Sequence, residues 1–302
     1  MILFSILLFA LLVLSLIRFS AFEFLSPVAE KAHFFCLNYL PPESRALAEL
    51  KALVCAENFS SLNDSQLYIS SGLIHLFVVS GAHLLLIERL LRRSKCNTGI
   101  IFFILVLYAF ACNLGAPVVR CLLAFGLNFF LLTKNIRWPA HFRLLLIGLA
   151  TLCFNYNWIN SLSLQLSWLA AFLMMLGETF FTNSSKLFKQ SLFFVTLLPT
   201  VVFFQIPGVG TILLNILLAP VLEFVLFPLG LCTWFFAPAY RLFDFAINLF
   251  KSVLTFLELD FQIQLEEISA RLTFYNWALL LLLHLVFHLF HVHKARSSPD
   301  EN

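Results

Sequence analysis

The sequence predicts an all-α, polytopic helical membrane protein with about ten spans, some of them broken or re-entrant helices. Two observations predict this fold class. Hydrophobic residues make up 61% of the 302 residues and charged residues only 12%, whereas a soluble domain has roughly 45–50% and about 25%. Apolar runs also recur from residue 2 to residue 290, which leaves no room for a separate soluble domain of about 100 residues.

The predicted spans follow one another along nearly the whole chain. Most are close to the roughly 20 residues that a helix needs to cross hydrocarbon, and the shorter ones favour tilted, re-entrant or bundle-buried helices. The apolar runs lie at residues 1–17, 67–86, 99–113, 116–133, 142–156, 160–181, 191–206, 209–236, 242–259 and 273–292.

Charged loops orient these spans. The loop at 88–98 contains four basic residues, which the positive-inside rule places in the cytoplasm. Alternate counting then puts both termini inside. The run 209–236 is longer than one span requires and contains Pro220 and Pro228; if it is a re-entrant pair, the topology after it is inverted.

The N-terminal third contains the longest polar region, residues 20–66. The run before it has no leading charge and no small-residue cleavage site, so we expect a retained span, although an uncleaved signal-like anchor has the same pattern. Leu47, Leu50 and Leu53 fall at helical spacing. This spacing indicates either an amphipathic helix on the membrane face or a small hairpin packed on the spans, and both interpretations stay open.

The chain therefore divides into three predicted segments. Residues 1–66 hold the first span and a short extracytoplasmic amphipathic region, residues 67–236 a core, and residues 237–302 the last spans and a short polar tail. Seven single cysteines without a CxxC pair are typical of buried free thiols. A Cys36–Cys55 disulfide requires that the polar region faces an oxidising compartment.

The stretch from Leu67 to Leu86 is apolar but carries His75, Ser80 and His83. Each polar group placed in hydrocarbon must find a partner or cost free energy, so these groups must be met inside the protein. Glycines at both ends of the polar part allow a break in the helix, a feature that exposes backbone groups in transporters. The predicted helix breaks in the chain are at Gly72, Gly81, Pro207, Gly208 and Pro220.

Other polar side chains inside the apolar runs are Arg120, Gln165, Asn215 and Glu223. Arg120 stays charged in hydrocarbon, so it must face a carboxylate, backbone carbonyls or a wet cavity. Glu223 is its natural candidate partner, because it is the only carboxylate well inside an apolar run. An internal ion pair that locks two helices is the alternative to a polar path.

No catalytic, metal or cofactor site is expected. A Ser80–His83 protease pair would need hydrogen-bond reach that this spacing does not provide. His284, His288 and His291 share one helical face near the C-terminus, where they indicate an interfacial histidine cluster rather than a metal centre.

Four ordered blocks resemble the ComEC family of competence membrane proteins, the channel for DNA uptake across the bacterial cytoplasmic membrane. GLIHLFVVSGAHLLL at 72–86 is similar to the family's G-L-x-H-L-L-A-(I/V)-S-G-L-H motif. VVRCLL at 118–123 resembles its V-L-R-A segment, and SLQLSWLAAF at 163–172 its F-Q-L-S-F-L-A segment. Residues 203–231 resemble its block that ends N-x-x-x-x-P-x-x-x-x-x-x-P-L-G.

The resemblance implies an inner-membrane, multi-pass permease for single-stranded DNA without catalysis of its own. It covers the channel domain only, because we find no segment for the OB-type or metallo-β-lactamase domains of full-length members. Separate DNA-binding, nuclease and ATPase subunits and a homo-oligomer are therefore expected partners beside the lipid bilayer. A small-molecule transporter or non-catalytic assembly subunit remains the alternative, because Arg120 is the one cation that we find inside the spans. The predicted path residues are His75, Ser80, Gly81, His83, Arg120, Gln165, Ser167, Asn215 and Glu223.

Overall fold

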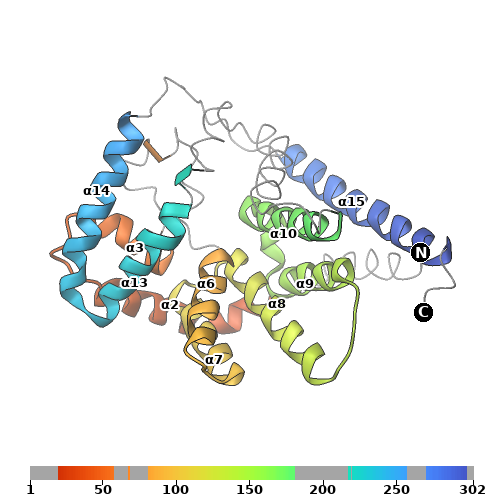
Figure 1. The fold of residues 1–302 in the computed structure, drawn as a ribbon, viewed down its shortest axis with the longest axis horizontal. Helices are drawn as coiled ribbons and strands as arrows, with labels where there is room; N and C mark the ends of the chain where they lie inside the picture. Colours follow the sequence, from red (N-terminus) through yellow and green to blue (C-terminus); the bar gives the residue numbers. More distant parts are fainter. Residues whose placement is uncertain are drawn as a thin grey trace. The chain divides into compact units, whose positions relative to one another are not determined.

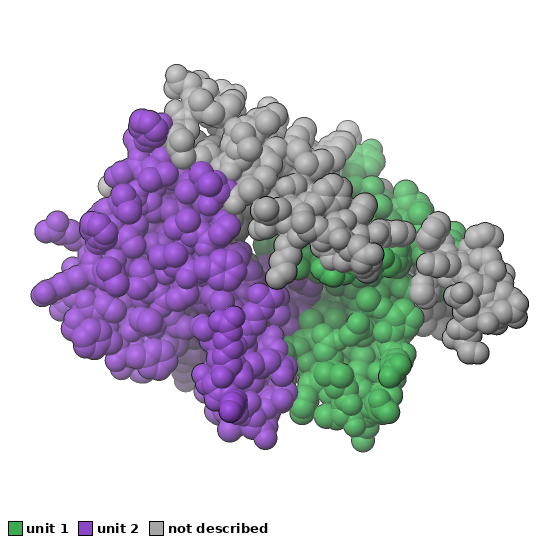
Figure 2. Space-filling model, viewed as in Figure 1, with its two compact units in different colours: residues 1–22, 123–200, 267–302 green, residues 23–122, 201–266 purple. Residues whose placement is uncertain are grey.

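The computed structural model describes residues 20–57, 67–68, 81–180, 217–218, 220–256 and 270–297. Secondary structure in these residues is helical and includes no strand, so the all-α prediction is confirmed for them. The chain forms two compact units (Figure 2). Unit 1 comprises residues 1–22, 123–200 and 267–302, and unit 2 comprises residues 23–122 and 201–266.

Unit 2 is built from α-helices of 9 to 18 residues, and α3 lies close to α13 and α14 (Figure 1). The boundary between the units falls within α8, and α2 starts one residue before unit 2. In chain order its elements are α2 (Phe22–Tyr39), α3 (Leu47–Cys55), α6 (Gly81–Arg93), α7 (Thr98–Ala111), the first part of α8 (Ala116–Thr133), the π-helical segment η3 (Leu222–Leu226), α13 (Phe227–Phe235), the 3-10 turn η4 (Ala237–Ala239) and α14 (Tyr240–Phe256).

Helix α3 forms the core of unit 2. Leu50, Leu53 and Val54 are fully buried. A Cβ added at Gly230 of α13 would lie 2.9 Å from Cγ2 of Val54, so the glycine is what allows α13 to pack this closely on α3. The Tyr108 hydroxyl of α7 donates to the Val54 carbonyl at 3.0 Å. Residues 47–55 are therefore helical, as their spacing predicts, and Leu50 and Leu53 pack inside unit 2.

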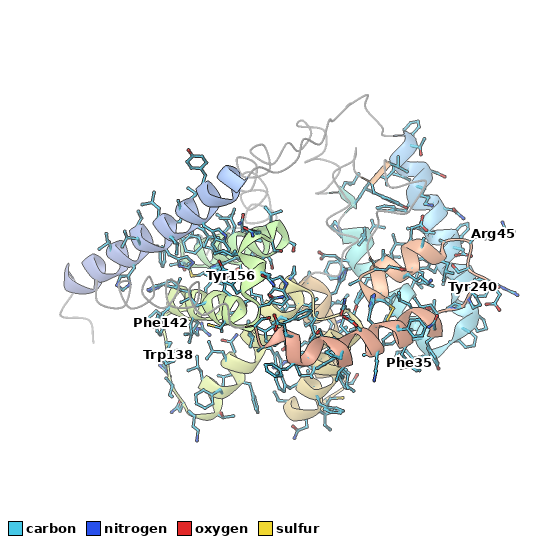
Figure 3. The ribbon with its side chains drawn as sticks, turned by 180° about the vertical axis from the view of Figure 1, so that it is seen from behind. Phe35, Arg45, Trp138, Phe142, Tyr156 and Tyr240 are labelled. Atoms are coloured by element: carbon cyan, nitrogen blue, oxygen red, sulfur yellow. A yellow bond between two sulfur atoms is a disulfide. The ribbon has the colours of Figure 1, made fainter. Side chains whose placement is uncertain are left out.

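Specific polar bonds tie α3 to its neighbours. A disulfide joins Cys36 of α2 to Cys55, so these two cysteines are not the free thiols that the composition favours. The Asp244 carboxylate of α14 accepts hydrogen bonds from the Ser44 hydroxyl at 2.6 Å and from the backbone N–H of Arg45 at 2.9 Å. Figure 3 labels Arg45, which lies just before α3, and Tyr240, the first residue of α14; the two lie near each other.

Unit 1 contains the second part of α8, then α9 (Ala140–Phe154), the 3-10 turn η2 (Tyr156–Asn160), α10 (Leu162–Phe180) and α15 (Ala270–Ser297). Trp168 of α10 is 1% exposed. A Cβ added at Gly148 of α9 would lie 2.1 Å from the Trp168 ring. Gly148 therefore opens the space between α9 and α10 that the indole fills. Trp138 and Phe142, labelled in Figure 3, stack edge-on before and within the first turn of α9.

Helix α8 is the one described helix that is long and apolar enough to cross a membrane, and it coincides with the predicted span 116–133. Shorter apolar helices lie at Thr98–Ala111, Ala140–Phe154, Leu222–Phe235 and Trp277–Leu289. They match four further predicted runs in position, but not in the length of a full span. The predicted runs 1–17 and 191–206 lie outside the described residues.

Two predicted runs differ in character from a plain span. Helix α6 starts at Gly81 and continues to Arg93, through the first part of the predicted loop 88–98; Arg92 Nε donates to the Glu88 carboxylate at 2.5 Å, an (i, i+4) pair that supports the extra turn. In helix α14, Asp244 bonds to the residues just before α3 and Lys251 pairs with Glu49 of α3, whereas Leu242, Phe245 and Leu249 are exposed. Its charged side chains therefore face the protein interior.

Candidate functional site

The start of α6 packs closely on α8. A Cβ added at Gly81 would lie 3.3 Å from Cβ of Cys121, and the Cys121 thiol donates to the Gly81 carbonyl at 3.4 Å. Arg120 is the neighbour of Cys121 in α8 and is half-buried. Gly81 therefore brings the end of the stretch 67–86 next to the turn of α8 that carries Arg120.

The turn between α7 and α8 sets the direction of α8. Asn113 and Leu114 both have left-handed backbone angles, with φ of 52° and 49°. Asparagine tolerates this region, whereas leucine is rare there. The Leu114 N–H donates to the Ala109 carbonyl at 2.9 Å, which closes the end of α7 and holds the turn that leads to Arg120.

His83 lies one turn into α6 and is 1% exposed. Its ring centroid lies 4.2 Å from that of Phe227, the first residue of α13. The predicted path residue His83 therefore contacts the buried ring of Phe227. Phe227 follows the π-helical segment that holds Glu223.

Glu223 lies in the π-helical segment η3 and is half-buried. Arg89 of α6 is a cation whose field acts on the Glu223 carboxyl group, and the predicted pairing of Arg120 with Glu223 stays a prediction. Arg120 acts, together with Glu88, on the Cys121 thiol.

The predicted break at Pro220 falls just before η3. The chain is helical at Pro220 and Val221, and the irregularity follows at Leu222–Leu226, where the Phe227 N–H bonds to the Leu222 carbonyl in the π register. Pro228 has no N–H to donate to the preceding turn, which accounts for a wider turn here. A π segment inside a helix is frequent at functional sites, and this one holds Glu223.

Gln165 and Ser167 belong to α10 in unit 1. Gln165 is 3% exposed, and its Nε2 donates to the Ile159 carbonyl at 3.3 Å. Trp277 of α15 donates to the same carbonyl at 2.6 Å. Gln165 therefore links α10 to the η2 turn. His75, Ser80, Asn215, Gly72, Pro207 and Gly208 lie outside the described residues.

A comparison with models of protein families shows to which family the chain belongs. The family model described as "Competence protein" matches residues 56–292, a segment that contains every predicted path residue. The chain belongs to the Competence protein family. No curated protein matches it, and no solved structure matches it.

Family membership confirms the resemblance drawn from the four sequence blocks and associates the protein with competence and DNA uptake. Gly81, His83, Arg120 and Glu223 lie in unit 2 of this Competence family protein, and Gln165 and Ser167 lie in unit 1.

Sequence reasoning missed several polar groups of this Competence family protein. Asp244 and Glu49 are buried charged residues, and Glu49 forms a salt bridge with Lys251 while it accepts from the Tyr68 hydroxyl at 3.4 Å. Ser44, the partner of Asp244, and Lys251, the cation of Glu49, lie about 200 residues away in the chain, so local spacing carries no signal for these pairs. His141 was also missed, although it begins an apolar helix and is buried.

Proposed function

We propose that this protein is a permease that carries single-stranded DNA across the cytoplasmic membrane during competence and has no catalysis of its own. The observation that carries the proposal is the match of the Competence family model to residues 56–292. The four ordered sequence blocks fall within that match. His75, Ser80 and Asn215 keep their proposed place on the path together with Gly81, His83, Arg120, Gln165, Ser167 and Glu223.

Residence in the inner membrane as a multi-pass protein is part of the proposal. Large apolar side chains are more than half exposed on α7, α8 and α15, among them Phe103, Leu132 and Leu282. Such exposed apolar surface is expensive in water and is expected in contact with lipid. Helix α8 has the length for a span, and the shorter apolar helices are proposed to be tilted or re-entrant.

The disulfide supports an orientation. Disulfides persist in oxidising compartments and are rare in the cytosol, so Cys36–Cys55 supports an extracytoplasmic position for residues 20–66. The basic end of α6, with Arg92 and Arg93, is proposed to be cytoplasmic by the positive-inside rule. Both termini are then cytoplasmic.

Arg120 is proposed to contact DNA phosphate. It is half-buried beside the Gly81–Cys121 contact, and an arginine presents a planar donor fork that matches a phosphate. A DNA strand along a whole path requires more cations than this. Separate DNA-binding, nuclease and ATPase subunits, or a homo-oligomer, are proposed to contribute further cations to the path.

The test is transformation of a clean deletion strain complemented with variants. Arg120→Ala is expected to lower transformation about 10- to 100-fold, the effect of losing one buried charge-assisted contact. Arg93→Ala, at the exposed end of α6, is the matched control and is expected to transform as wild type. Immunoblots of the membrane fraction measure protein level. Unchanged transformation in Arg120→Ala at normal level contradicts the assignment of Arg120.

The sparse positive charge favours a second candidate, a small-molecule transporter or a non-catalytic assembly subunit with the same fold. A deletion strain that takes up DNA normally but loses transport of another compound supports this candidate and excludes the permease. A deletion strain that loses DNA uptake and regains it on complementation with the wild-type gene supports the permease instead.

A further inference from the structure

Three histidines from two helices meet inside unit 1. His141 is in the first turn of α9, and His284 and His288 are one turn apart on α15. Nε2 of His141 lies 3.3 Å from Nδ1 of His288. His141 and His284 are 6% and 3% exposed. A histidine is costly inside an apolar bundle unless its ring nitrogens are satisfied, so the convergence of three requires a reason.

The surroundings of the cluster are aromatic. The ring centroids of Phe172 and His284 lie 4.5 Å apart, and Phe287 is edge-on to His141 at 5.4 Å. Other titratable or charged side chains described on the packed elements are few: Arg143 and Cys153 on α9, Tyr156 on η2, Glu178 on α10 and Tyr275 on α15. Arg143 Nη1 donates to Asn128 of α8 at 2.7 Å.

The hydrogen bonds decide which nitrogen of His284 carries the proton. Trp168 Nε1 donates to His284 Nε2 at 3.1 Å, so this nitrogen is an acceptor and the neutral ring carries its hydrogen on Nδ1. In the part of the chain that the structure describes, Nδ1 has no hydrogen-bond partner. A buried donor without an acceptor is destabilising. Packing alone therefore does not account for His284.

The His141–His288 contact can hold one extra proton. When both rings are neutral, one N–H donates to the bare nitrogen of the other ring. A proton added to the pair leaves the same contact as a charge-assisted bond from imidazolium to imidazole, which is the stronger bond. A second added proton would oppose two cations whose nitrogens lie 3.3 Å apart in apolar surroundings. The pair thus binds a single proton.

We propose that His141 and His288 form a proton-binding site in unit 1, beside His284 on the same face of α15, and that its occupancy changes the packing of α15 on α9 and α10. Histidine is the side chain suited to this near neutral pH. We also propose that binding of the proton regulates the passage of DNA. This second proposal rests on the proposed permease function. The proton site itself does not require it.

The test is a pH titration of the full-length protein in lipid nanodiscs, followed by tryptophan fluorescence. Trp168 is bonded to His284, which lies one turn from His288 on α15, so the indole fluorescence reports a change in how α15 packs on α10. Wild-type protein is expected to show one single-proton transition between about pH 4 and 8, which is lost in Trp168→Phe. His284→Gln and His288→Gln are expected to abolish it or to move it by about one pH unit or more.

The matched control is His33→Gln in unit 2, where the His33 ring bonds to the Ala111 carbonyl at 2.9 Å; this variant is expected to titrate as wild type. If the buried His284→Gln protein does not fold, the half-buried His288→Gln decides the result. A wild-type protein that shows no transition, or cluster variants that titrate unchanged, overturns the proton site.

The titration uses no DNA, so it separates the two proposals. Transformation measured at two external pH values is expected to depend on pH in wild type and to lose that dependence in His288→Gln. An unchanged dependence in this variant overturns the regulatory use of the site. A deletion strain that transforms normally overturns the permease and leaves the titration result standing.

Discussion

The two units of this protein are held together by different chemistry. In unit 2, a disulfide, the Glu49–Lys251 salt bridge and the Asp244 hydrogen bonds fasten the short helix α3 to α2 and α14. In unit 1, α9, α10 and α15 meet through aromatic rings and uncharged hydrogen bonds, such as Trp168 to His284.

The difference follows from helix length and sequence separation. Helix α3 has nine residues, too few to be stable without tertiary contacts, and its partner Asp244 lies about 200 residues later. Directional bonds fix such a distant partner in one register. The longer helices of unit 1 present continuous apolar faces, and close packing of rings suffices. Loss of one directional bond should therefore lower the stability of unit 2 more than that of unit 1. Added side-chain volume should instead lower the stability of unit 1 more.

The largest effect is expected for Lys251→Ala. The Glu49 side chain is 3% exposed, so removal of its cation leaves a buried charge, which costs about 3–5 kcal/mol of the free energy of unfolding. The measurement is unfolding in mixed detergent micelles. The double variant Glu49→Gln with Lys251→Met carries no charge and is expected to recover most of the loss. A Lys251→Ala loss below about 1 kcal/mol would contradict the buried-pair account.

The next effect is expected for Cys36→Ser with Cys55→Ser. The disulfide closes a loop with a sequence separation of 19 residues, so its loss should lower the free energy of unfolding by about 3 kcal/mol. Cys232→Ser, at an exposed free thiol of the same unit, is the matched control and should have no measurable effect. Equal stability of the disulfide variant and the control would show that noncovalent contacts alone hold α2 to α3.

The sequence was sufficient for the helices and offered the Cys36–Cys55 pair as one possibility, but it was insufficient for the salt bridge and for the hydrogen bonds of Asp244. Helix α8 coincides with its predicted run, because an uninterrupted apolar stretch is a local signal. The burial of Glu49 and the pairing of Asp244 with the residues before α3 depend on contacts between distant segments. In the candidate site, Gly81 and Arg120 were predicted from their residue types. The nearness of Arg89 to Glu223 could not be predicted in this way, because it depends on how α6 and η3 pack.

A smaller effect, in unit 1, is expected for Gly148→Ala. The added methyl group would lie 2.1 Å from the buried Trp168 ring, and overpacking of this kind costs about 1–3 kcal/mol. Gly177→Ala on α10 is the matched control. Its Cβ meets no atom within 4 Å, so the better helix propensity of alanine should raise stability by about 0.5–1 kcal/mol. The same sign of change in both variants would contradict the packing account of unit 1.

The smallest effect is expected for Glu88→Gln. Glu88 pairs with Arg92 at 2.5 Å, but the Arg92 side chain is 49% exposed and the Glu88 side chain 15%. An exposed (i, i+4) pair contributes only about 0.3–0.5 kcal/mol, and salt screens it. The unfolding free energies of wild type and Glu88→Gln should therefore differ by no more than that at low salt and should converge at high salt. A loss as large as that of Lys251→Ala would mean that ion pairs stabilise unit 2 regardless of burial. Burial would then not decide how much an ion pair of unit 2 contributes.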